Sequence, residues 1–299
     1  MDRFHAMQVF VAVAETEGFA SGARRMNMSP PAVTRAVAAL EARLGVRLLH
    51  RSTRHVRVTE AGARYLEDAR RILAEVAQAD DAAAGINAEP RGSLTVTASV
   101  LFGHIFVMPG IVDYLQRYPQ TRVDALFVDR VVNFIDEGVD VAVRIGELPD
   151  SSLRARRVGQ VRMVLCASPD YLARRGLPAS PDELAEHDMI RSSAGTNAYD
   201  WRFSTPEGHR LVRLNPRLSV STNDGAISAA LEGFGITRLL SYQVAPHLAD
   251  GRLKILLPDF EPPPRPVHLV HREGPQGSRK VRAFVDLLAQ RLMNDPALN

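Results

Sequence analysis

The chain has little cysteine and little lysine, and both shortages are informative. Cys166 is the only cysteine among 299 residues, so no internal disulfide can form and nothing points to an oxidising compartment. Lys254 and Lys280 are the only lysines among 37 basic residues, which leaves 37 − 2 = 35 arginines. Guanidinium groups favour planar, bidentate contacts with phosphate or carboxylate, although a codon bias would also enrich arginine.

Long apolar runs are missing as well. No stretch approaches the ~20 apolar residues that a membrane-spanning helix needs. The first residues also lack the apolar segment and the small-residue cleavage site of a secretory signal. We therefore expect a cytoplasmic protein with no membrane partner.

The motifs that would indicate catalysis are incomplete. GFGITR at 233–238 lacks the third glycine of a dinucleotide fingerprint, and RSSAG at 191–195 lacks the first glycine of a nucleophile elbow. His268 and His271 stand three apart in an expected strand, so they would point to opposite faces and could not share a metal. Cys166 lies in an apolar run that suits packing. We expect no enzyme activity, no cofactor and no metal site.

What the sequence does have is positive charge near its start. Residues 1–60 contain nine arginines and five acidic residues, a net of +4, while the whole chain carries +3, so the remainder sums to 3 − 4 = −1. Positions 24–57 hold eight arginines and one acidic residue, Glu41. Such a segment is typical of a surface that meets a polyanion, although arginines also occur on solvated surfaces that bind nothing.

Two helices are predicted before residue 27. Residues 2–17 form an amphipathic helix that ends at Gly18, and a short helix at 21–26 turns Met26 inward. The apolar stripe of the first helix consists of Phe4, Met7, Phe10, Val11 and Ala14.

A third helix begins after Ser29. A serine N-cap followed by Pro30 and Pro31 marks a helix start, because proline lacks the N–H that would be unpaired in the first turn. The helix stops at Gly45. Its inward positions, at spacings of four, three and four, are Val33, Val37, Leu40 and Leu44.

A basic β-hairpin and a long helix come next. The hairpin covers 46–59 with a polar tip at Ser52 and Thr53, and Thr59 then caps a helix that runs to Asn87. A heptad seam favours pairing with another helix over the alternative, a lone helix that lies on the next domain. The seam consists of Tyr65, Ala69, Ile72, Val76, Ala79, Ala83 and Ile86.

The remainder alternates between strands and helices. After a linker at 88–92, this alternation predicts an α/β domain with a parallel or mixed sheet. Strands are expected at 93–99, 122–128, 139–146, 161–168, 217–221, 235–240, 253–257 and 267–271, and helices at 105–118, near 131–138 and at 281–293.

The first three helices have the plan of a helix-turn-helix, with a tight turn at Asn27 and Met28. The last helix of that motif enters the major groove of DNA with its first turns against base edges. Arg35 can bind guanine or phosphate, and Thr34 offers a hydroxyl or a methyl. The hairpin would form a wing whose arginines reach phosphates or a narrow minor groove. The expected DNA contacts are Ser29, Pro30, Pro31, Thr34, Arg35, Arg51 and Arg54, with Arg57 also on the wing.

This stretch resembles the LysR-type transcriptional regulators. The matching residues are Met26, Ser29, Ala32, Val33, Thr34 and Arg35, then Leu40, Glu41, Leu44 and Gly45, then Arg51, Arg54, Thr59, Ala61 and Gly62. Pro30 and Ala36 replace frequent glutamines that could read a base, so no target sequence is carried over. Gly22 and Ala20 replace a usual alanine and a usual cap, which should weaken the second helix slightly.

The resemblance implies an all-α winged helix-turn-helix, a linker helix, and a C-terminal α/β periplasmic-binding-protein-like domain of two subdomains. It also implies dimers that associate into tetramers on double-stranded DNA with an interrupted dyad operator. The implied limits are 1–58, 59–90 and 91–299, with subdomain I at about 91–163 and 266–299 and subdomain II at about 164–265.

The resemblance also implies a small organic effector between those subdomains, and the residues there would suit a carboxylate. Helix starts at Ser99 and Asn223 offer hydroxyl and amide groups, and Arg144 is the expected counter-charge. The expected apolar walls are Phe127, Trp201 and Phe203.

A plainer interpretation of these residues stays open. Ser99 and Asn223 would then only cap their helices, and Arg144 would pair with Glu147 or Asp129. Asp224 would also supply the second helix with its negative partner.

The sequence therefore indicates a one-component transcription regulator that responds to a small effector. The alternative is a cytoplasmic small-molecule-binding protein whose basic end docks on another protein. Strongly salt-dependent binding to a DNA duplex would distinguish the two.

Overall fold

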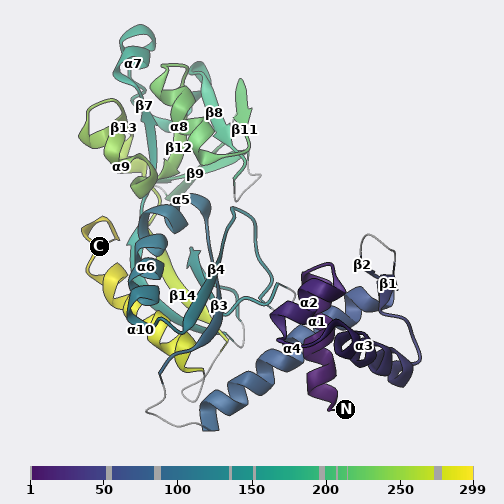
Figure 1. Ribbon diagram of the computed structural model, residues 1–299. Helices are drawn as coiled ribbons and strands as arrows, with labels where there is room; N and C mark the ends of the chain where they lie inside the picture. The colour runs from purple at the N-terminus through teal and green to yellow at the C-terminus, as the bar shows by residue number, and fades with distance from the viewer. Residues whose placement is uncertain are drawn as a thin grey trace. The chain divides into compact units, whose positions relative to one another are not determined.

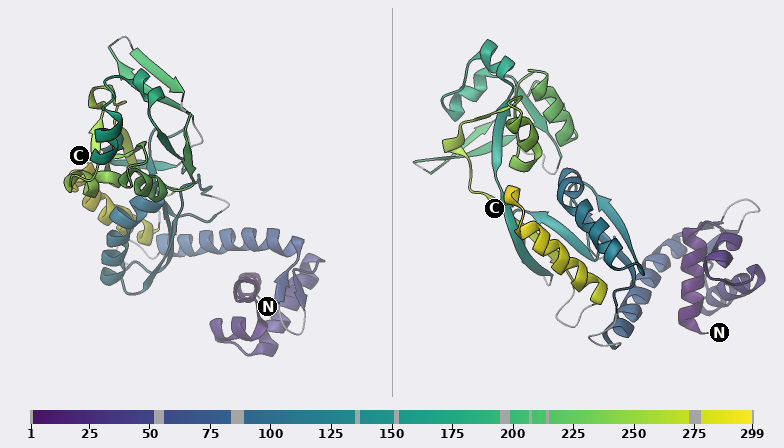
Figure 2. Two further views of the ribbon diagram at one scale, coloured as in Figure 1. Left: turned by 90° about the horizontal axis from the view of Figure 1, so that it is seen from above. Right: turned by 60° about the vertical axis from the view of Figure 1, so that its left-hand side comes forward.

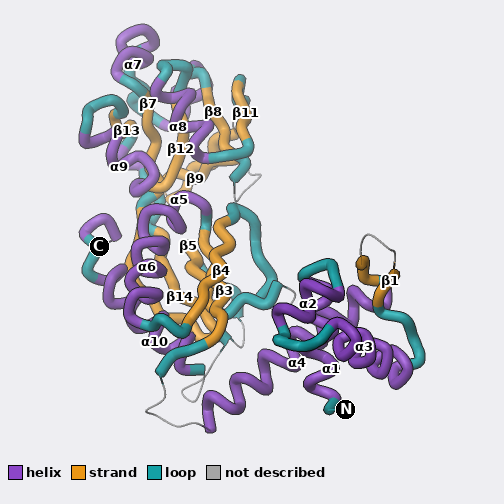
Figure 3. Tube along the Cα trace, viewed as in Figure 1, coloured by secondary structure: helices purple, strands orange, loops and turns teal. Residues whose placement is uncertain are grey.

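The computed structural model describes residues 2–51, 56–83, 89–134, 137–150, 153–194, 199–206, 208–213, 215–272 and 278–298. The chain forms two compact units, the first built mainly from residues 1–88 and the second from most of residues 89–299. Figure 1 labels the helices and strands of both units, and Figure 3 separates helix from strand by colour.

The described part of the first unit is helical apart from one small hairpin. Its elements are α1 (Arg3–Glu15), α2 (Phe19–Arg25), α3 (Pro30–Leu44), β1 (Leu49–Arg51), β2 (Val56–Val58) and α4 (Glu60–Ala83). The two strands are antiparallel, with Leu49 opposite Val58 and Arg51 opposite Val56. The predicted winged helix-turn-helix with a long helix after it is confirmed.

Helix α1 is the centre of this unit, and it packs against α2, α3 and α4. Because it has neighbours on several sides, its buried face is wider than one stripe. Phe4 is 42% exposed, so the predicted stripe was wrong to include it. The buried residues of α1 are Ala6, Met7, Val9, Phe10, Ala12 and Val13.

The helix boundaries of α2 and α3 refine the sequence prediction. α2 begins at Phe19 rather than at residue 21, because the extended Gly18 is its N-cap. Ser29 occupies the predicted N-cap of α3, but its side chain makes no capping hydrogen bond, so the two prolines define this start. Gly45 ends α3 with φ 71°, the left-handed conformation that glycine adopts easily.

Gly22 lies where α2 meets α1. A Cβ on this residue would stand 2.7 Å from Cγ2 of Val13 and 3.1 Å from the Val13 Cα. From the sequence alone, we expected Gly22 only to weaken the second helix slightly. Its role in the structure is to let α2 approach α1 closely.

Thr59 and Gly62 form the junction between the hairpin and α4. Thr59 Oγ1 accepts a hydrogen bond from the Gly62 N–H (2.8 Å) and donates one to the Arg47 carbonyl (2.8 Å), which confirms the predicted cap. The Thr59 N–H donates to the Leu48 carbonyl (2.9 Å). Gly62 is so close to Leu48 that a Cβ there would overlap the Leu48 carbonyl oxygen.

The first part of the predicted heptad seam is already used inside the first unit. Tyr65 packs against the N-terminal core with its ring centroid 5.6 Å from that of Phe10, and Ala69 is fully buried. Arg70 also pairs with Glu15 of α1 at 3.0 Å. The side chains of Ala79, Ala83 and Ile86 lie outside the described residues. Pairing of α4 with another chain therefore stays a prediction that concerns its second half.

The second unit contains two five-stranded mixed sheets, which Figure 2 shows as separate lobes. The first sheet has the order β4-β3-β5-β14-β6, with β3 parallel to β4 and β5, and β14 antiparallel to β5 and β6. Its strands are β3 (Gly92–Ala98), β4 (Thr121–Phe127), β5 (Val141–Ile145), β6 (Arg154–Val161) and β14 (Arg265–His271).

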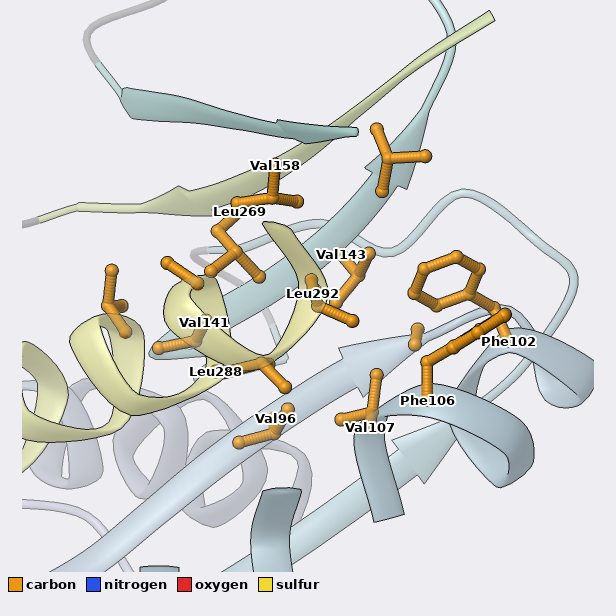
Figure 4. Packing of buried hydrophobic residues seen from close by; sticks show 14 of the residues in the cluster. Val96, Phe102, Phe106, Val107, Val141, Val143, Val158, Leu269, Leu288 and Leu292 are labelled. Carbon is orange, nitrogen blue, oxygen red and sulfur yellow. The ribbon is translucent and has the colours of Figure 1, made fainter. Parts of the chain in front are cut away.

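Helices cover one face of this first sheet. Valines and leucines of the strands pack against Phe106, Val107, Leu288 and Leu292, which all belong to the helices on this face (Figure 4). The elements that carry these residues are α5 (Val100–Phe102), the π-helical turn η1 (Gly103–Val107), α6 (Met108–Arg117), α10 (Arg279–Met293) and η4 (Pro296–Leu298). The helix predicted near 131–138 is wrong for the described residues of that stretch, which form loops and turns.

The second sheet has the order β11-β8-β12-β7-β13, and a separate hairpin pairs β9 with β10. Its strands are β7 (Met163–Ala167), β8 (Met189–Ser192), β11 (Leu218–Val220), β12 (Ile236–Leu240) and β13 (Lys254–Leu256), and the hairpin consists of β9 (Asp200–Thr205) and β10 (Gly208–Arg213). The remaining elements are α7 (Pro169–Arg175), η2 (Pro181–Glu186), α8 (Asn223–Leu231), α9 (Ser241–Ala249) and η3 (Pro258–Phe260).

Each face of the second sheet carries its own core. One core contains Cys166 and Ile190 and packs under α8 and α9, and the other contains Leu165 and Met189 and packs under the β9–β10 hairpin. The chain passes between the two sheets at β6–β7 and at η3–β14. The predicted two-subdomain α/β fold is confirmed, whereas β6, β8, β9 and β10 were not predicted.

In the described part of the chain, no helix is long and apolar enough to cross a membrane. Cys166 is completely buried, and burial raises the pKa of its thiol to about 12. A thiol-specific reagent at pH 8 should therefore leave the native protein unmodified and react with one equivalent of thiol in strong denaturant. Rapid modification of the native protein would contradict this packing role.

Candidate nucleic-acid interface and effector site

Helix α3 presents its first turn outward. Ser29, Pro30, Pro31 and Arg35 are exposed. The opposite face carries Val33, Ala36, Val37 and Leu40, which are buried in the N-terminal core. The structure therefore brings four of the predicted DNA contacts onto one solvent-facing surface.

Thr34 and Ala36 differ from what the sequence suggested. Thr34 Oγ1 donates its proton to the Pro30 carbonyl at 3.0 Å, so only its lone pairs and its methyl remain for a base. Ala36 is fully buried, so this position would not face a base. The interpretation that Ala36 removes a base-reading group was therefore wrong.

The wing continues directly from α3. Arg51 lies at the end of β1, and Arg57 is exposed on β2, where it pairs with His50 across the hairpin. Arg54 lies outside the described residues. Leu48 and Leu49 anchor the base of the wing in the N-terminal core.

Glu41, the only acidic residue among the arginines of 24–57, fixes the wing to α3. Its Oε1 accepts hydrogen bonds from the N–H groups of Leu48 (2.9 Å) and Leu49 (3.1 Å). A carboxylate is the strongest acceptor for backbone N–H groups. The one acidic residue of this basic segment therefore positions the hairpin.

Replacement of Glu41 by glutamine should therefore lower the free energy of unfolding by about 1–2 kcal/mol, because the charge-assisted bonds become neutral ones. Urea unfolding of the whole protein measures this loss. Glu60→Gln is the control, since the exposed Glu60 carboxylate pairs with Arg64. Equal losses of unfolding free energy in both variants would contradict the role of Glu41 in holding the wing to α3.

Two further arginines of the basic segment have internal partners. Arg25 forms an ion pair with Glu15 (2.7 Å), and Arg24 donates to Ser21 Oγ (3.2 Å). Glu15 also holds Arg70 of α4. The outward positive surface is therefore centred on α3 and the wing rather than on α2.

In the second unit, Ser99, Phe127 and Arg144 lie at the carboxyl ends of the parallel strands β3, β4 and β5, but Phe127 and Arg144 point to opposite faces of the sheet. Phe127 packs on the helical face beside Gly103 and His104. Ala98 is opposite Phe127 in the β3–β4 register, and Thr97 is opposite Ala142 in the β3–β5 register. Ser99 directly follows β3, and Arg144 lies two residues beyond Ala142 on β5. The carboxyl ends of three parallel strands thus carry a hydroxyl, a ring and a guanidinium, which is the usual ligand-binding edge of such a sheet.

Ser99 stands at the start of α5, but it does not cap it with its side chain. Asp129 Oδ1 accepts a hydrogen bond from the Val100 N–H at 3.1 Å, so a carboxylate already lies at this helix start. Asp129 therefore has a role other than pairing with Arg144. Ser99 Oγ is shielded from solvent and makes no well-formed hydrogen bond within the described residues. Burial raises the pKa of Tyr242 to about 12, and the nearby Ser99 hydroxyl partly opposes that rise.

Arg144 projects from the sheet face opposite the helical core. It donates to the Val132 carbonyl at 2.7 Å, and His268 is its neighbour on β14. The Nδ1 of His268 is buried without a hydrogen-bond partner among the described residues. The sequence gave no effector role to Tyr242 of α9 or to His268 of β14, and the β5–β14 register brings His268 beside Arg144.

The other three predicted effector residues lie in the second subdomain. Asn223 is the first residue of α8, but Thr222 is the N-cap, and its hydroxyl accepts from the Gly225 N–H at 3.1 Å. Trp201 and Phe203 are buried in the core under the hairpin, on the sheet face opposite α8. The structure does not bring them together with Asn223.

This arrangement defines a helix-turn-helix protein whose second unit has the two-sheet architecture of a ligand-binding domain. Residues 4–63 match the model described as bacterial regulatory helix-turn-helix protein, lysR family, and residues 87–293 match the LysR substrate binding domain. The chain belongs to the LysR family of transcriptional regulators.

Individual relatives agree along the whole chain. The regulator CrgA of Neisseria meningitidis serogroup B is 33% identical over 290 residues, 97% of each chain. The solved structure of CrgA has a TM-score of 0.62 at 32% identity and covers 97% of this chain and 99% of that one. The full-length Vibrio cholerae virulence activator AphB has a TM-score of 0.64 at 26% identity, with coverages of 97% and 99%.

Proposed function

We propose that this regulator binds an interrupted dyad in double-stranded DNA through α3 and the wing, and that a small organic anion controls it from the cytoplasm. The observation that carries the DNA half is the exposed turn Ser29–Pro31 with Arg35 beside it, over a fully buried opposite face. Such a helix fits the major groove with base-contacting side chains at its start. Arg51 and Arg54 would bind phosphates or a narrow minor groove from the wing.

A dyad requires two copies of the reading helix at a fixed spacing. The second half of α4 supports pairing, because its heptad stripe continues beyond the residues that pack on α1. A dimer through α4, and a tetramer built from two dimers, would present α3 helices to successive major grooves.

The effector half rests on the edge formed by Ser99, Phe127 and Arg144. A guanidinium and a shielded hydroxyl at neighbouring strand ends suit a carboxylate. Asn223 at the start of α8 would complete the site from the second subdomain, while Trp201 and Phe203 support that subdomain from its core.

Two measurements test this function. Footprinting on DNA upstream of the protein's own gene should show a protected, dyad-symmetric stretch, and affinity for it should fall steeply with salt. A molecule that stays monomeric and prefers no duplex at low salt would refute the DNA half.

A thermal-shift screen of small carboxylates tests the effector half. A stabilising carboxylate should lose its effect in Arg144→Met and keep it in Arg122→Met, which removes an exposed charge from β4. An equal response from both variants would place the effector elsewhere.

A further inference from the structure

Two arginines of the second subdomain lie side by side under the β9–β10 hairpin. In the β8–β12 register, Met189 is opposite Ile236 and Ile190 is opposite Thr237. One further step places Arg191 beside Arg238. Met189 and Ile236 belong to the core under the hairpin, so the two arginines, each two residues further along its strand, project from that same face. Figure 1 shows β8 and β12 as neighbours.

Both guanidinium groups are held among aromatic rings. Arg191 lies over Tyr199, with its Cζ 4.3 Å from the ring centroid. Arg238 lies between Trp201 and Phe203, with its Cζ 5.6 Å and 5.2 Å from their centroids. The rings attract the positive charge of each guanidinium. They supply no oxygen or nitrogen acceptor for its N–H groups, which lie in the guanidinium plane.

The unmet donors are specific. Arg191 is 9% exposed, its Nε donates to Ser219 Oγ at 3.5 Å, and its buried Nη1 has no hydrogen-bond partner within the described residues. Arg238 donates from Nη2 to the Arg202 carbonyl at 2.9 Å, and its buried Nε is likewise unpartnered there.

The charge of this pair is uncompensated as well. Among the described residues, no acidic group pairs with Arg191 or Arg238. Burial and, to a smaller extent, the positive charge of Arg265 lower the pKa of Arg238 to about 10. A positive charge in a partly dry environment is costly unless an anion accompanies it.

We propose that Arg191 and Arg238 form a second ligand site, which binds the oxyanion group of a small molecule under the β9–β10 hairpin. The Nη1 of Arg191 and the Nε of Arg238 donate to its oxygens, and Tyr199, Trp201 and Phe203 keep the guanidinium planes in place. A carboxylate and a phosphate share this chemistry. The site goes beyond the proposed function, because it uses neither Arg144 nor the edge of the first sheet.

The test measures thermal unfolding of the full-length protein at constant ionic strength, with chloride exchanged for inorganic phosphate, acetate or benzoate. At least one anion should raise the melting temperature in a saturable way, and the effective probe distinguishes phosphate from carboxylate ligands. Arg238→Met and Arg191→Met keep the apolar stems and should weaken that response roughly ten- to a hundredfold.

Two matched variants make the result specific. Arg202→Met and Arg213→Met each remove an exposed charge from the same hairpin and should respond like the wild type. Without added anion, Arg238→Met should melt at or above the wild-type temperature, because an uncompensated buried charge is gone.

Three results would overturn the proposal. They are no saturable response to any of the three anions, an unchanged response in both Arg238→Met and Arg191→Met, or an equal loss of the response in Arg202→Met and Arg213→Met. An unchanged response in Arg238→Met and Arg191→Met that is lost in Arg144→Met would move anion binding to the proposed effector edge, whereas a failure of DNA binding would leave this second site untouched.

Discussion

Arg35→Ala is expected to weaken binding to the operator by about 1–3 kcal/mol, roughly ten- to a hundredfold in Kd, because Arg35 lies on the exposed early face of α3. The backbone of that helix is set by two prolines and a buried opposite face, none of which involves the Arg35 side chain. The variant should therefore unfold like the wild type while its DNA contact is lost.

Fluorescence anisotropy with the protected duplex and with a scrambled duplex measures this effect. Arg64→Ala is the matched control, because it removes the same charge from an exposed position of α4. A specific contact predicts a large loss for Arg35→Ala on the protected duplex and a small one on the scrambled duplex. Comparable losses of affinity from both variants would show that Arg35 contributes only its positive charge. They would contradict the assignment of α3 as the helix that contacts the bases.

Gly62→Ala should have the largest effect on stability in the first unit. Ala normally favours a helix over Gly by about 1 kcal/mol, so propensity alone predicts stabilisation. The structure reverses the sign, because a Cβ at Gly62 overlaps the Leu48 carbonyl oxygen, which already accepts from the Thr59 N–H. Backbone must move to make room, and we expect a loss of about 3 kcal/mol in the free energy of unfolding.

Urea unfolding of the whole protein, followed by helix content, measures this loss. Gly18→Ala is the control, since the atom nearest to a Cβ there is Ser21 Oγ at 3.5 Å, an ordinary contact. Operator binding should fall with the Gly62 variant, because the same junction positions the wing. A stabilised Gly62→Ala protein would show that the α4 junction is looser than the structure indicates.

The first unit could be predicted almost completely from its sequence because its signals are local. Proline at Pro30, glycine at Gly45 and the hydroxyl of Thr59 mark helix ends within one turn of the chain. The prediction for Phe4 was wrong because a single apolar stripe assumes one buried face, whereas α1 packs against three helices. The prediction for Ala36 was wrong because the family resemblance indicates which residue type is usual at a position. It does not indicate which face of the helix that position occupies.

The second unit was less predictable where strands are short or charged. Strand β6 carries Arg154, Arg156 and Arg157 and does not resemble a buried run, yet it pairs with β14 along its length. The β9–β10 hairpin was missed although the turn residues Pro206 and Gly208 separate two alternating stretches. That signal would have placed Trp201 and Phe203 in a core before any ligand role was considered.

By itself the sequence determined the type of protein: a basic helix-turn-helix end, a long helix and an α/β remainder, all encoded by periodicity and capping over a few neighbouring residues. Only the tertiary structure decided which polar groups meet. Arg144 lies beside His268, and Arg191 lies beside Arg238, because of registers between strands that are distant in the chain, and Glu41 binds the wing because the hairpin folds back onto α3. Register depends on the packing of whole sheets, so local composition does not specify it.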